Sequence, residues 1–189
     1  MGERGGRVIA HSFAEQDAFS KRAEDEAFWL AAYKAFFPDF LTMSPCVPNV
    51  DAQRMGVDRV IVLTNGREVR IDEKKRAQTY TGADGKPDIL LEFLSNDRIG
   101  APGWIAKPLL IDFIAYGLLD TKMVYMLPWD GLRRVWRGNG DGWKQRYGVK
   151  KAVNNGYSTH SVAVPVSELY RAISAACQVT GVQTVAKGN

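Results

Sequence analysis

Two short segments of the chain place carboxylates and lysines at neighbouring positions. Asp58 opens the run DRVIVL, and Asp72, Glu73 and Lys74 close the run REVRIDEK. Carboxylate oxygens are the ligands that Mg²⁺ prefers, and a nearby ammonium group can orient a water molecule and balance charge on a phosphate. This combination of residue types is therefore typical of metal-dependent hydrolysis of phosphodiesters.

The residues between the two acidic segments predict the structure that would bring them together. Residues 57–63 are rich in β-branched side chains, residues 68–74 alternate between apolar and charged, and Asn65-Gly66 separates the two runs. Asn-Gly between two such runs is the strongest short-range signal for a β-hairpin. A hairpin here would return Asp58 to the side of residues 72–74.

The register of this hairpin decides which carboxylate and which lysine share a face with Asp58. A two-residue loop at the Asn-Gly turn would set Asp58 opposite Glu73, and Glu73 and Lys75 would be the pair on its face. A three-residue loop with a bulge would set Asp58 opposite Asp72, and Asp72 and Lys74 would be the pair.

We expect the second register, because Val69 and Ile71 would then pack on the face away from the charges. Asp72 and Lys74 are accordingly the expected pair, and Glu73 remains a candidate ligand. The competing interpretation is an exposed hairpin whose charge run is only solvated.

The order of an acidic residue, a hairpin, and then an apolar residue followed by Asp or Glu, any residue and Lys resembles the motif of the PD-(D/E)XK nuclease superfamily. Ile71-Asp72-Glu73-Lys74 matches the second half of this motif, and Asp58 supplies the first. Over residues 26–173, segments such as DILLEFLSN, GWIAK and YSTHSVAVPVSEL also resemble a group of uncharacterised phage and bacterial proteins assigned to that superfamily.

The resemblance implies a restriction-endonuclease-like core and a nuclease of phage or bacterial origin that acts on nucleic acid, most of all DNA. It implies Mg²⁺ as the cofactor, with Mn²⁺ as a substitute, and a homodimer or a phage or host protein as further candidate partners. It also assigns roles to residues. Asp58 and Asp72 would hold the metal, with Glu73 or Glu26 assisting, and Lys74 would position the attacking water.

Glu26 is singled out by its position as well. It lies on the apolar stripe of an expected first helix, where a carboxylate needs a partner or a metal because burying a bare charge is costly. A carboxylate at the edge of the stripe that reaches solvent is the alternative.

Hydrophobic periodicity and turn signals predict the order of the elements. They predict helices over residues 14–37, 104–119, 130–136 and 168–177, and strands over residues 57–63, 68–74, 88–94, 122–127 and 161–164. This alternation predicts a single α/β domain over residues 13–178 with a mixed central sheet flanked by helices, between a loose segment 1–12 and a flexible tail 179–189. Glu92 becomes a secondary site candidate, because we expect the strand 88–94 to lie beside the second hairpin strand.

Basic and aromatic side chains alternate most densely in residues 133–151, with a turn expected at residues 138–142. Cationic groups interleaved with aromatic rings suit phosphate contacts combined with base stacking, although the tryptophans could equally belong to the core beneath a solvated basic face. Lys107 lies near the start of an expected helix, where backbone N–H groups can help to hold a phosphate. The candidate nucleic-acid-binding residues are Lys107, Arg133, Arg134, Arg137, Lys144 and Arg146.

Composition limits the remaining classes. The 189 residues carry a net charge of +4, which is compatible with a polyanionic partner but does not require one. Cys46 and Cys177 lack metal-ligand spacing and indicate a reducing compartment. The chain shows no apolar run of bilayer length and no signal peptide, so we expect a cytoplasmic protein without a membrane partner. The competing function is a catalytically silent nuclease-like fold that binds nucleic acid or a host protein.

Overall fold

The hairpin that the sequence predicts lies in the larger of two β-sheets. The computed structural model describes residues 23–45, 55–82 and 84–177. The larger sheet has the strand order β1-β2-β3-β6-β7. Its strands are β1 (Phe40–Pro45), β2 (Arg59–Leu63), β3 (Glu68–Arg76), β6 (Phe113–Leu118) and β7 (Met123–Pro128). β3 and β6 run parallel and the other neighbours antiparallel, so the sheet is mixed, as predicted.

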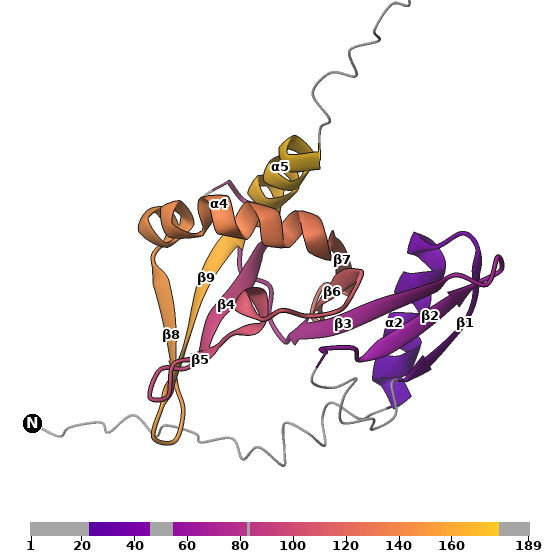
Figure 1. Ribbon diagram of the computed structural model, residues 1–189, viewed down its shortest axis with the longest axis horizontal. Helices are drawn as coiled ribbons and strands as arrows, with labels where there is room; N and C mark the ends of the chain where they lie inside the picture. The colour runs from indigo at the N-terminus through magenta and orange to yellow at the C-terminus, as the bar shows by residue number, and fades with distance from the viewer. Residues whose placement is uncertain (1–22, 46–54, 83, 178–189) are drawn as a thin grey trace, which may run out of the picture.

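The second sheet is antiparallel and is formed by residues between and after the strands of the first. Its order is β5-β4-β9-β8, with β4 (Asp88–Asn96), β5 (Ala101–Pro102), β8 (Val149–Val153) and β9 (Ser158–Pro165). Three helical segments pack against the second sheet: η1 (Trp104–Ala106), α4 (Trp129–Tyr147) and α5 (Val166–Cys177). In Figure 1, α4 runs across the top of β4 and β9, while α2 (Ala23–Phe36) lies against the hairpin strands of the larger sheet.

Two hydrophobic clusters lie on opposite faces of the larger sheet. Trp29 and Tyr33 of α2 pack with Ile71 and Ala115 on one face. On the other face, alternate residues of β6, such as Ile114, join a core shared with the second sheet, α4 and α5. Because β6 is buried on both faces, its sequence is apolar at almost every position.

Three predictions about the elements are wrong. The predicted helix over residues 104–119 is only a short 3₁₀ turn at Trp104–Ala106 followed by the strand β6, since a strand buried on both faces lacks the alternation that would reveal it. The predicted helix 130–136 does not end at the glycine-rich turn; α4 continues through residues 138–142 to Tyr147. The strand β4 exists, but the neighbours of β3 are β2 and β6, and β4 belongs to the other sheet.

Some predictions lie outside the described residues. The segment 1–12, the tail 179–189 and the domain limits at residues 13 and 178 belong to this group, as does Cys46. Within the described ranges, no helix is long and apolar enough to span a bilayer.

Candidate functional site

The loop of the central hairpin has three residues, which selects the second of the two registers. Leu63 N–H donates to the carbonyl oxygen of Arg67 at 2.9 Å, so Thr64, Asn65 and Gly66 form the loop. Gly66 has a φ of +80°, the left-handed conformation that a bulged three-residue hairpin needs at this position. The Asn65 side chain accepts a hydrogen bond from Arg67 N–H at 2.9 Å and helps to fix the loop.

This register brings the carboxylates of Asp58 and Asp72 together just beyond the last pair of the hairpin. Arg59 pairs with Ile71, and Asp58 N–H donates to the Ile71 carbonyl at 2.9 Å. The Asp58 carboxylate also accepts a hydrogen bond from Glu73 N–H at 2.8 Å, which holds its side chain across the strand. The expectation that Val69 and Ile71 face away from the charges is confirmed, because both pack in the cluster beneath α2.

Asp58, Asp72 and Lys74 form one group of charges on this face. We call the two carboxylates, Asp58 and Asp72, the acidic pair. Asp72 is only 3% exposed and makes an ion pair with Lys74. Burial and, to a lesser extent, the adjacent Asp58 carboxylate raise the pKa of Asp72 to about 7, against the opposing charge of Lys74. Two carboxylates crowded in this way gain from a cation between them.

The acidic pair opens into a pocket of about 400 Å³. Its lining residues are Gly56, Asp58, Asp72, Lys74, Trp104, Lys107 and Leu109. The first four come from the hairpin and its approach, and the last three from the connection between β5 and β6. The connection therefore brings Lys107 to the pocket that the hairpin carboxylates also line.

Gly56 and Leu109, which the sequence reading did not single out, meet at one wall of this pocket. Gly56 has a φ of +77°, and a Cβ atom there would lie 2.7 Å from a Leu109 methyl group. The sequence carries a weak signal for this contact, because a glycine just before the first hairpin strand is compatible with such a close approach.

Glu92 of β4 is also near the pocket, although not for the reason that the sequence suggested. Gly103 packs on its backbone so closely that a Cβ at Gly103 would lie 2.2 Å from the Glu92 carbonyl oxygen, and this contact fixes η1 against β4. Burial raises the pKa of Glu92, while the charges of Lys107 and Lys74 and a hydrogen bond from the Trp104 backbone act in the opposite direction. Glu92 thus belongs to the electrostatic surroundings of both pocket lysines.

Glu73 and Glu26 lie on the opposite face of the larger sheet, and the structure does not bring them to the acidic pair. Glu73 accepts hydrogen bonds from Tyr33 Oη at 2.8 Å and Arg59 Nε at 3.0 Å. The side chain of Glu26, 61% exposed, lies 3.3 Å from the Arg59 guanidinium. The reason is strand parity: Glu73 shares a face with Ile71 beneath α2, one residue out of phase with Asp72.

We expect Glu73→Gln to lower the free energy of unfolding by roughly 2–3 kcal/mol, because the buried Arg59 would lose the closer of its two carboxylate partners and keep only the exposed Glu26. Urea denaturation of the variant, with the exposed Glu68→Gln on the same strand as the control, measures this difference. An unchanged stability together with a loss of any hydrolytic activity would place Glu73 in the pocket chemistry instead.

The candidate basic residues of α4 separate into different surroundings. Arg133, Arg134 and Arg137 border a hollow of about 280 Å³ together with Asp130. Lys144 lies over the ring of Phe93.

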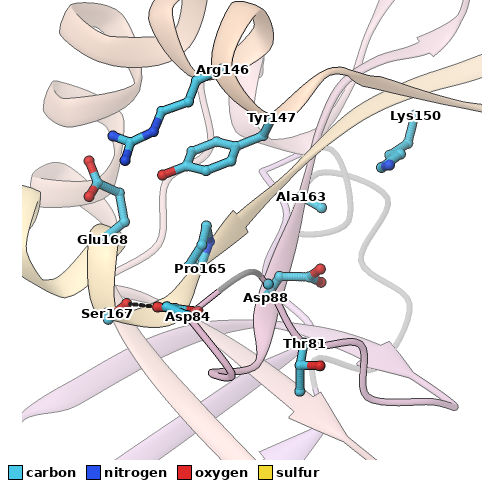
Figure 2. A pocket seen from close by; sticks show the side chains of 11 residues that line it. Thr81, Asp84, Asp88, Arg146, Tyr147, Lys150, Ala163, Pro165, Ser167 and Glu168 are labelled. Carbon is cyan, nitrogen blue, oxygen red and sulfur yellow. Dashed lines mark hydrogen bonds between the residues drawn. The ribbon is translucent and has the colours of Figure 1, made fainter.

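Arg146 lines a different pocket, of about 330 Å³, beside the start of α5. Figure 2 shows its guanidinium directed toward Glu168, with Tyr147 next to it and the hydrogen-bonded pair Asp84 and Ser167 below. Its neighbours include the carboxylates of Asp84, Asp88 and Glu168, whereas Asp130 is the one carboxylate among the described residues that border the hollow of Arg133 and Arg137.

The donor set of the acidic pair suits a hard divalent cation, because both groups are carboxylates and Asp72 is desolvated. Among the described residues, no three acidic, histidine or cysteine side chains are grouped closely enough to form a complete metal cage. Two protein carboxylates with water and substrate oxygens completing the shell is the usual mode of Mg²⁺ binding. Comparison with protein families, with curated proteins and with solved structures finds no match for this chain.

Proposed function

We propose that this protein is a metal-dependent phosphodiesterase that acts on nucleic acid, with DNA as the expected substrate. The observation that carries the proposal is the placement of Asp58, just before β2, beside Asp72 and Lys74 of β3, at a pocket that Lys107 also lines. The resemblance to the PD-(D/E)XK motif agrees with the same three residues and with a restriction-endonuclease-like core.

In the proposed mechanism, Asp58 and Asp72 would hold Mg²⁺, which when bound supplies Lewis acidity at a phosphate oxygen. Lys107 binds the phosphate in the pocket and orients it. Lys74 donates a hydrogen bond to the attacking water and offsets the negative charge that develops on the phosphate. The water oxygen forms a bond to phosphorus and loses a proton to solvent. The bond to the leaving oxygen breaks, and that oxygen takes up a proton.

A second candidate is a nucleic-acid-binding protein with the same surface and no catalysis. It needs only the positive charges of this surface and no metal, and among the described residues no third acidic, histidine or cysteine side chain is grouped with Asp58 and Asp72. A module that binds a host protein is supported by no particular contact among those that the structure describes.

The experiment that tests the proposal incubates the purified full-length chain with supercoiled plasmid, linear duplex and single-stranded DNA. Each substrate is assayed with Mg²⁺, with Mn²⁺ and with EDTA. We expect cutting with either metal and none with EDTA. If folded protein cuts no substrate under any of these conditions, the proposed phosphodiesterase activity is refuted, and nucleic-acid binding without catalysis becomes the favoured function.

A further inference from the structure

One flank of α4 carries a stripe of cationic side chains. Arg133, Arg137 and Lys144 are four and seven residues apart and therefore fall on one side of the helix. From Arg133 to Lys144 the stripe spans eleven helical rises, or about 17 Å at 1.5 Å per residue. This length corresponds to roughly five base pairs of duplex, each of which rises 3.4 Å. Part of the Lys144 charge is offset by Asp141, whose carboxylate lies 2.8 Å from its ammonium group.

The stripe is joined to the candidate site through Trp129. The Arg133 guanidinium lies 5.6 Å from the centre of the Trp129 ring. The indole N–H of Trp129 donates to the Leu109 carbonyl at 3.0 Å, and Leu109 lines the pocket of the acidic pair beside Lys107. One buried ring thus separates the pocket wall from the first arginine of the stripe.

The aromatic side chains along this stripe are not available for base stacking. Trp104, Trp129 and Trp143 are 8%, 2% and 3% exposed. Trp136 is half-buried and stacks on Phe93 with ring centres 6.0 Å apart, and the Lys144 ammonium lies over both rings. Proteins that bind single strands without sequence preference present open aromatic rings to successive bases, and these rings are covered.

We propose that the substrate is a nucleic-acid duplex, held by its phosphate backbone along Lys107, Arg133 and Arg137. This inference rests on the proposed function and narrows its substrate. The cations supply the charge that a phosphate backbone requires. The hollow that Arg133, Arg134 and Arg137 border can receive phosphate oxygens, since three guanidinium groups there outnumber the single carboxylate of Asp130. A duplex hides its bases in the stack, so a surface of cations without open rings suits it better than a single strand.

The test is the affinity of the full-length chain, in EDTA, for a labelled duplex and for one of its strands, measured by fluorescence anisotropy between 50 and 300 mM salt. These conditions prevent cutting, so the outcome is independent of whether the protein is a nuclease. We expect the duplex to bind at least about tenfold more tightly than the single strand at equal salt.

Arg133→Gln with Arg137→Gln should weaken duplex binding about tenfold and lower the slope of log affinity against log salt by about two. Glutamine keeps part of the side chain over Trp129. The control, Lys86→Gln with Arg171→Gln, removes the same charge from exposed positions near the start of α5 and along it, and should change the affinity less than twofold. Thermal melts of both variants check that the fold is intact.

Equal or tighter binding of the single strand would contradict the proposal that the substrate is a duplex. Equal losses of duplex affinity in the two double variants would contradict the proposal that the stripe on α4 is the binding surface. If the protein binds duplex through the stripe but cuts no substrate, the inference about duplex binding holds and only the proposed nuclease activity is rejected.

Discussion

Asp72→Asn and Lys74→Ala should each lower the rate of DNA cutting by a factor on the order of 10²–10⁴, the range seen when one charged group of a catalytic site is removed. Asp72 would hold the metal, and it is buried beside Asp58 with its charge opposed to that of Lys74. Removal of either partner leaves the other charge without its counterpart in the pocket. Initial rates on linear duplex in Mg²⁺ measure the effect.

The neighbouring positions of β3 offer matched controls. Glu73 and Lys75 alternate with Asp72 and Lys74 and occupy the face beneath α2, so Glu73→Gln and Lys75→Ala should keep the rate within about tenfold of the wild type. The reverse result would be loss of cutting in these two variants and its retention in the first two. It would favour the register with a two-residue loop, in which Glu73 and Lys75 form the site, and would contradict the site described above.

The second large effect concerns stability. In the absence of metal, the free energy of unfolding should fall by roughly 2–4 kcal/mol between pH 4 and pH 8 through Asp72 alone. The pKa of Asp72 is raised from an ordinary 3.8 to about 7 in the folded chain, mainly by burial. Between these two values the folded state holds a proton that the unfolded state has released, so the stability that this proton supplies is lost as pH rises.

Urea denaturation in EDTA from pH 4 to pH 8 measures this dependence, and the Asp72→Asn variant isolates it because asparagine does not titrate. The variant should be more stable than the wild type at pH 8 and should lack this part of the pH dependence. Parallel curves for the two proteins would contradict the assignment.

Mg²⁺ should reverse the penalty, because it favours the ionised carboxylates. At pH 8 it should stabilise the wild type by about 1–3 kcal/mol at concentrations well above its dissociation constant, and leave Asp72→Asn unchanged. The same denaturation experiment with and without the metal provides this measurement without any substrate. An equal effect of Mg²⁺ on both proteins would indicate that the metal binds elsewhere.

The central hairpin could be predicted from the sequence because its signals are local. Asn65-Gly66 marks the turn, the β-branched run marks the first strand, and the alternation around Val69 and Ile71 distinguishes the two faces. The loop length could not be derived with certainty from these residues, but the face argument selected the register that the structure shows. Asp58, Asp72 and Lys74 were therefore within reach of sequence reasoning.

The residues that the connection between β5 and β6 contributes to the pocket could not be predicted from the sequence, since their placement depends on contacts between distant segments. Lys107 was expected at the start of a helix, whereas it lies in a connection that reaches the hairpin from the second sheet. The misassigned run 104–119 is apolar almost throughout, and such a run fits a buried helix and a strand buried on both faces equally well. Which strand lies next to β3 is likewise decided by packing and not by order along the chain.

The continuous helix α4 shows packing overriding local propensity. Its glycines at positions 138, 140 and 142 each cost up to about 1 kcal/mol relative to alanine in a helix. Trp136 and Trp143 on either side bury enough apolar surface to offset this cost, and Gly140 leaves room for the Trp136 ring, which a Cβ would approach to 3.2 Å. A sequence window that contains only the glycines indicates a turn.

The parallel pairing of β3 with β6 has a consequence for how the site comes into being during folding. Asp58 and Asp72 meet within one hairpin, whose closure is local and fast, whereas Lys107 arrives only after the chain has built β4 and β5 and returned to β3. The acidic pair can therefore form in a partly folded chain in which Lys107, the group proposed to bind phosphate, has not yet reached the pocket. Competence to act on a substrate would appear with the slow, non-local step, so that incomplete chains on the way to the native state stay inert.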